Sequence, residues 1–178
     1  DLLYIKSSGF MLGNVNMYDG YTILNNDNII YGNKPSMEYN FHKLLKKYTI
    51  HLHFILSNIF LCSDKILNLD EFKYNYLMIE YIHPGDKLAN EINTKYNSEN
   101  IIFLKNHGII ITTDTFDDIY VLYYYIFNYF NNLLNKKYDN NIYAFKLNQD
   151  IYKKYNNTCL IENFYINFDI NNIIYCFP

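Results

Sequence analysis

Two histidines separated by one residue carry the clearest chemical signal in this sequence. His51 and His53 flank Leu52 in a stretch rich in residues that favour β-strands. Side chains two positions apart on a strand point to the same face, so we expect both imidazoles to approach one point. Neutral imidazoles are common ligands of zinc and similar divalent ions. The spacing alone leaves two interpretations open: a metal site, or two ordinary histidines at the end of a strand.

A third histidine strengthens the metal hypothesis. His107 follows the apolar segment Ile101 to Leu104 and precedes Gly108, a residue type that lets another group approach the backbone closely. Three histidines with one open position form a ligand set typical of catalytic zinc. Taken alone, His107 is equally compatible with a histidine of the core.

Glu38 is the candidate acid/base. Ser36 is placed to cap a helix, and Glu38 then falls in the first turn, where the helix dipole favours a carboxylate with no further role. A functional interpretation, as a general base or a metal-associated carboxylate, requires that this turn face the histidines. His42, one turn further along, is interpreted as a surface or supporting residue outside the catalytic set.

Two turns of small residues are candidate anion sites. Ser7-Ser8-Gly9 and Lys34-Pro35-Ser36 offer hydroxyl and backbone N–H groups that suit a phosphate. Each is also compatible with a plain turn. The sequence holds no GxGxxG or GxxxxGK[ST] motif and no local Ser-His or Cys-His signature, so those chemistries are set aside.

The elements that must position these residues alternate between strands and helices. Patterning predicts strands at Leu3–Ile5, Tyr21–Leu24, Ile29–Tyr31, Tyr48–His53, Ile101–Leu104 and Ile109–Thr112. It predicts helices at Met37–Lys46, Phe54–Leu61 and Lys87–Lys95, and a long helix capped by Thr115 and Asp118 that ends near Lys136. Weaker elements are expected at Ile151–Tyr155, Phe164–Phe168 and Ile173–Tyr175. Without a regular βαβ period, the fold class is α/β or α+β with a mixed or antiparallel sheet.

Composition excludes several classes of function. The 178 residues fit one domain, and an apolar content of 50% argues against a disordered chain. A formal charge of -3 offers no broad basic surface for nucleic acid, and the longest apolar run, Ile119 to Phe127, is too short to span a bilayer. Three scattered cysteines without a CxxC motif indicate a reducing, cytoplasmic setting.

Several segments, read together and in order, resemble the class II aldolase/adducin family over about residues 4 to 135. They are the run from Leu3 to Gly9, Pro35-Ser36-Met37-Glu38 with His42, His51-Leu52-His53, Pro84-Gly85 with Leu88-Ala89, and the run from Leu104 to Ile110. The combination of PSxE, HxH and NHG in this order is far more specific than any one of these motifs.

The resemblance implies a set of residue roles. In the enzymes of that family, the equivalents of His51, His53 and His107 bind a catalytic zinc or another divalent metal ion, and the equivalent of Glu38 acts as acid/base or extra ligand. Ser8, Gly9 and Ser36 would bind the substrate phosphate. The family also implies a three-layer α/β/α fold with a largely antiparallel central sheet, and a homotetramer with active sites between subunits.

Departures from the family pattern set the expected domain boundaries. Residues 1–137 would form the class II aldolase/adducin-like domain without its usual N-terminal helix and Gly-Asn loop, and residues 138–178 an unassigned C-terminal extension. Met37 stands where several members have a second small hydroxyl residue. The tyrosine that some aldolases lend to a neighbouring subunit has only Tyr74 or Tyr76 as candidates.

The expected function is a metal-dependent lyase that cleaves a small phosphorylated ketose by retro-aldol chemistry through a metal-stabilised enediolate. The same metal site also supports epimerases, dehydratases and decarboxylases, which remain alternatives. A non-catalytic interaction module of the adducin type is the alternative from another class. Retention of all three histidines and of Glu38 argues against it, because a scaffold has no need of an open metal site.

Overall fold

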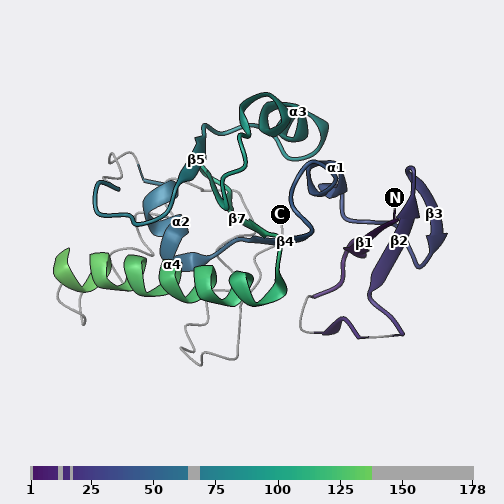
Figure 1. Ribbon diagram of the computed structural model, residues 1–178, viewed down its shortest axis with the longest axis horizontal. Coiled ribbons are helices and arrows are strands. Elements are labelled where there is room, and N and C mark those ends of the chain that lie inside the picture. The colour runs from purple at the N-terminus through teal and green to yellow at the C-terminus, as the bar shows by residue number, and fades with distance from the viewer. Residues whose placement is uncertain (1, 12–13, 17, 64–68, 138–178) are drawn as a thin grey trace. The chain divides into compact units, whose positions relative to one another are not determined.

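The computed structural model describes residues 2–11, 14–16, 18–63 and 69–137, which form two compact units (Figure 1). The described residues of 1–46 and 82–97 belong to unit 1, and those of 47–81 and 98–137 to unit 2. Each unit is therefore built from two separate stretches of the chain.

Unit 1 contains a three-stranded antiparallel sheet and two helices. The strands β1 (Leu2–Lys6), β2 (Tyr21–Asn25) and β3 (Asn28–Tyr31) lie in sequence order. A two-residue turn with positive φ at both positions, Asn26 and Asp27, joins β2 to β3, as the right-handed twist of a hairpin favours. The helices α1 (Tyr39–His42) and α3 (Asp86–Lys95) contact each other and supply the buried side chains Phe41, Leu88, Ala89 and Ile92.

Unit 2 contains a four-stranded mixed sheet with the order β4-β7-β6-β5. The antiparallel strands are β4 (Tyr48–Leu52), β7 (Gly108–Thr113) and β6 (Ile101–Leu104), and β5 (Tyr76–Ile79) runs parallel to β6. Every residue of β6 and β7 is buried. Accordingly, β6 is entirely apolar, and β7 consists of β-branched residues after its first residue, Gly108. The helices α2 (Ile55–Leu61) and α4 (Phe116–Lys137) contact each other and β7.

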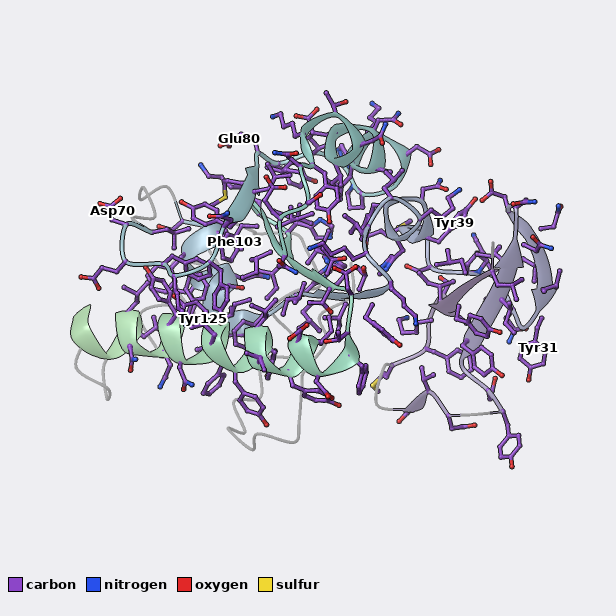
Figure 2. The ribbon with its side chains drawn as sticks, viewed as in Figure 1. Tyr31, Tyr39, Asp70, Glu80, Phe103 and Tyr125 are labelled. Atoms are coloured by element: carbon purple, nitrogen blue, oxygen red, sulfur yellow. The ribbon has the colours of Figure 1, made fainter. Side chains whose placement is uncertain are left out.

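The core of unit 2 lies between its sheet and these two helices. Ile119, Leu122, Ile126 and Phe130 recur at helical spacing on the buried side of α4. Aromatic rings extend this core: Phe72 meets Phe103 edge to face at 5.5 Å between ring centroids, and Tyr125 at 5.1 Å. Figure 2 labels Phe103 and Tyr125 within this aromatic cluster. Leu52 of β4 and Ile109 of β7 belong to this core.

Most of the predicted elements are confirmed, with two corrections. The helix predicted at Met37–Lys46 is only the four-residue α1, and its N-cap is Glu38 instead of Ser36. Residues of α1 such as Tyr39 and Asn40 are weak helix formers, so nothing local extends the helix. The strand β5 was not predicted. The elements expected at Ile151–Tyr155, Phe164–Phe168 and Ile173–Tyr175 lie outside the described residues.

Candidate metal centre

His51 and His53 come together at the end of β4. His51 is paired with Ile110 of β7, and His53 follows the strand directly, so the two side chains leave the backbone on the same face. Their Nε2 atoms are 3.1 Å apart and their ring centroids 4.9 Å apart. The geometry expected from the HxH spacing is thus present.

His107 completes a triangle with these two rings. It lies in the turn between β6 and β7, and its ring centroid is 4.8 Å from that of His51 and 4.9 Å from that of His53. The three rings are steeply inclined to one another, with interplanar angles of 64° to 77°. One nitrogen from each ring lies within 4.8 Å of the others, so the three can converge on a single ion.

The backbone around His107 is shaped for this close approach. Asn106 adopts a left-handed conformation with φ 56°, and the N–H of His107 donates to the carbonyl of Leu104 at 3.2 Å, which closes the turn. At Gly108, a Cβ atom would overlap the carbonyl oxygen of Leu52 and lie 3.2 Å from Cδ2 of His53. Glycine is therefore required here, as its place after His107 predicted.

A hydrogen bond fixes the orientation of His51. Its Nδ1 lies 3.0 Å from the carbonyl oxygen of Ile109, which can only accept, so Nδ1 carries the proton. The Nε2 lone pair of neutral His51 then points at Nε2 of His53. Such a backbone partner on the remote nitrogen is the arrangement that orients histidine ligands in metal sites. His53 must place its own proton on Nδ1 before Nε2 can bind an ion.

The protonation state of His107 also suits a residue that binds a metal ion. Burial lowers the pKa of His107 to about 4, and the nearby charge of His53 adds to the effect. His107 is therefore neutral at physiological pH, the form that binds metal ions. Two ligand nitrogens of a tetrahedral zinc ion lie about 3.3 Å apart, given bond lengths near 2.0 to 2.1 Å. The 3.1 Å between His51 and His53 fits this value.

The two small-residue turns of unit 1 lie side by side. Ser7 forms an antiparallel bridge with Pro35; the N–H of Ser8 donates to the carbonyl of Lys34 at 2.8 Å, and that of Ser36 to Lys6 at 3.2 Å. Those two N–H groups are engaged in the bridge. The hydroxyls of Ser8 and Ser36 and the N–H of Gly9 take no part in this bridge.

Lys6 adds a positive charge to these turns. Its Nζ donates to the carbonyl of Ser7 at 3.0 Å and to that of Phe10 at 2.7 Å, and so holds the first turn closed. Partial burial lowers the pKa of this ammonium group. Sequence reasoning gave Lys6 no role, although it adjoins Ser7-Ser8-Gly9.

Glu38 lies at the start of α1, where its backbone N–H donates to Oγ of Ser36 at 3.4 Å. Burial raises the pKa of its carboxyl from 4.5 to about 7. Such a value is typical of groups that exchange protons at neutral pH. His42, kept outside the catalytic set, stacks on Phe41 at 4.6 Å between ring centroids, and burial lowers its pKa to about 4.

The family model named Class II Aldolase and Adducin N-terminal domain matches residues 1–133. The chain belongs to the class II aldolase and adducin family. A search of the curated proteins found no match.

Solved structures show that the fold is of the class II aldolase type. The N-terminal class II aldolase domain of a conserved protein from Thermoplasma acidophilum has a TM-score of 0.63 and 23% identity, covering 72% of each chain. L-fuculose 1-phosphate aldolase has a TM-score of 0.60 and 16% identity, over 74% of this chain and 68% of that one. YgbL from Klebsiella pneumoniae, a putative aldolase/epimerase/decarboxylase, has a TM-score of 0.53 and 20% identity, over 65% and 64%. The predicted α/β fold class is confirmed.

Among the described helices of this class II aldolase-type chain, none combines the length and the apolar character that crossing a membrane would require.

The candidate tyrosines Tyr74 and Tyr76 both lie in the aromatic cluster of unit 2. Tyr74 contacts Tyr125 at 4.8 Å between ring centroids, and Tyr76 contacts Phe103 at 5.5 Å.

Sequence reasoning missed Asn58 of α2. Its side-chain amide donates to the backbone carbonyl of His107 at 3.1 Å. No signal in the local sequence marks this residue, because the contact joins positions far apart in the chain.

Proposed function

We propose that this protein is a metal-dependent lyase that cleaves a small phosphorylated ketose by retro-aldol chemistry. The observation that carries the proposal is the cluster of His51, His53 and His107, whose ligand atoms lie within 4.8 Å of one another. A divalent cation such as zinc would polarise the carbonyl and hydroxyl oxygens of the ketose and stabilise the charge that develops as the carbon–carbon bond breaks.

The histidines hold the site, and Glu38 moves the proton. Retro-aldol cleavage needs a base that takes the proton of the hydroxyl beside the breaking bond, and an acid that returns a proton to the carbon fragment. With a pKa of about 7, the carboxyl of Glu38 populates both protonation states near neutral pH. The family resemblance assigns it this role.

The paired turns of unit 1 are proposed to bind the phosphate of the substrate. The hydroxyl groups of Ser8 and Ser36 and the N–H of Gly9 would donate hydrogen bonds to its oxygens. The ammonium group of Lys6, which holds the first turn, contributes charge of the right sign. The two turns are already joined by the Ser7–Pro35 bridge, so the donors are held in place before the substrate arrives.

The names of two structural neighbours are consistent with this proposal and with one alternative. One is an aldolase that acts on a sugar phosphate by its name, and another is described as a putative aldolase, epimerase or decarboxylase. A related epimerase, dehydratase or decarboxylase reaction on the same metal site is the second candidate, since each forms a similar negatively charged species. The proposed assembly is a homotetramer, as the family resemblance implies.

Metal analysis followed by an activity screen tests the proposal. The purified chain should bind one equivalent of zinc, and a series of phosphorylated ketoses should be split into an aldehyde and a smaller ketone phosphate. Glu38→Gln keeps the size of the side chain but not its base, so it should keep the metal and lose about 100-fold or more in turnover. A chain that binds zinc yet leaves every phosphorylated ketose intact would contradict the lyase assignment.

A further inference from the structure

The helix α2 makes two hydrogen bonds to the turn that carries His107. Nδ2 of Asn58 donates to the carbonyl oxygen of His107 at 3.1 Å, and the backbone N–H of Asn106 donates to the carbonyl of Leu61 at 3.1 Å. The first of these reaches the backbone of a candidate metal ligand through a side chain. It is therefore the contact that a substitution can remove.

The orientation of the Asn58 amide follows from its partner. The carbonyl oxygen of His107 can only accept a hydrogen bond, so the nitrogen of the amide must face it. Oδ1 of Asn58 is buried and, among the described residues, finds no hydrogen-bond partner. A buried polar atom without a partner destabilises the folded chain.

This cost argues against a purely structural role for Asn58. Leucine has a similar volume and forms helices better than asparagine, although it would leave the carbonyl oxygen of His107 without this donor. If the residue served only to pack α2 against the turn, leucine would suit the position better. Polar residues that are kept at a cost to stability mark functional positions in many proteins.

We infer that Asn58 is a positioning residue for the metal centre: its amide holds the backbone of His107 so that the imidazole stays in register with His51 and His53. This inference rests on the proposed function, because it presumes that the three histidines bind a metal ion. Groups that hold the ligands of a metal site change its affinity about 10-fold to 100-fold when they are removed. Asn58 acts through the main chain, so we expect a loss near the lower end.

Zinc affinity and a cobalt spectrum test the inference on the full chain. Asn58→Leu keeps the volume of the side chain without its donor, and Asn58→Ala removes both. Ser57→Ala is the matched control: the Ser57 hydroxyl donates to the carbonyl of Phe54 at 2.9 Å, which also accepts the N–H of Asn58, so that carbonyl stays paired. Zinc dissociation constants are measured by competition with a chromophoric chelator, and urea unfolding of the metal-free proteins is measured in parallel.

The expected result is a zinc affinity at least about 10-fold weaker in both Asn58 variants, with altered visible bands of bound Co²⁺. Ser57→Ala should match the wild type in both measurements. Unchanged zinc affinity and cobalt bands in Asn58→Leu would overturn the inference while the metal site stands, whatever happens to the stability of the metal-free protein. Failure of the wild-type chain to bind zinc would overturn the inference together with the proposed function.

Discussion

Replacing Glu38 with glutamine removes a carboxylate whose ionised form lowers the stability of the fold. Burial raises the pKa of this carboxyl from 4.5 to about 7, so the folded protein binds its proton more tightly than the unfolded chain does. Between these two pKa values the folded state carries the additional proton. By linkage, the contribution of Glu38 to stability falls as the pH rises through this window.

The size of the effect follows from the shift. One pKa unit corresponds to 1.36 kcal/mol, so the shift from 4.5 to about 7 corresponds to a loss on the order of 3 kcal/mol when the group ionises fully. Glutamine stays neutral at every pH. Glu38→Gln should therefore match the wild type near pH 4.5 and become more stable than it by up to about 3 kcal/mol above pH 7.

The assay is urea unfolding of both metal-free proteins at a series of pH values. Burial lowers the pKa of His42 and of His107 to about 4, and these groups destabilise the fold as the pH falls below 6.5. Both proteins contain them, so their effect cancels in the difference between variant and wild type. The control is Glu71→Gln, which makes the same substitution at an exposed position and so reports the effect of removing one carboxylate from the surface.

A pH-independent difference between Glu38→Gln and wild type would refute this reasoning. It would show that Glu38 ionises in the folded protein as it does in the unfolded chain. The residue would then be an ordinary carboxylate at the start of α1, and the proton carrier of the reaction would have to be sought elsewhere.

The remaining predictions concern the site and the assembly. Alanine at any one of the three clustered histidines should abolish stoichiometric zinc binding, with His83→Ala as control, and full zinc content in His51→Ala would rule out the site. Gly108→Ala should lower the thermal midpoint and weaken zinc binding, because its Cβ overlaps the carbonyl of Leu52; an unaltered variant would mean that the turn adapts freely. Ser36→Ala should raise KM for a phosphorylated ketose without affecting its unphosphorylated form, and equal KM values before and after the change would exclude the anion site. Light scattering should find a tetramer at micromolar concentration. A monomer at that concentration would contradict the proposed assembly.

Local patterns predicted the elements that carry the histidines. The strand β6 was predicted at its observed bounds because four apolar residues stand between turn residues, and the HxH pair follows from the two-residue period of β4. The long helix α4 was predicted from its apolar spacing and from Thr115, whose hydroxyl accepts the N–H of Asp118 at 3.4 Å. In these cases the short-range signal and the tertiary packing agree.

Two features depend on partners far away in the sequence and were not predicted. The strand β5 has no alternating pattern and is specified by its parallel pairing with β6, which follows it only after α3. The amide of Asn58 has meaning only once α2 packs beside the turn of His107. Spacing rules describe neighbours along a strand or helix, so they give no information about such contacts.

The order of the histidines along the chain means that a bound ion would join two distant positions of the sequence. His51 and His53 precede residues 54–106, and His107 follows them, so an ion held by all three would tie both ends of this long loop together. That loop contains residues 82–97, the second stretch of unit 1. An ion at 100 times its dissociation constant would add about 2.7 kcal/mol to the stability of any fold that requires the loop to be closed. Chelation should therefore destabilise unit 2, where both ends of this segment lie.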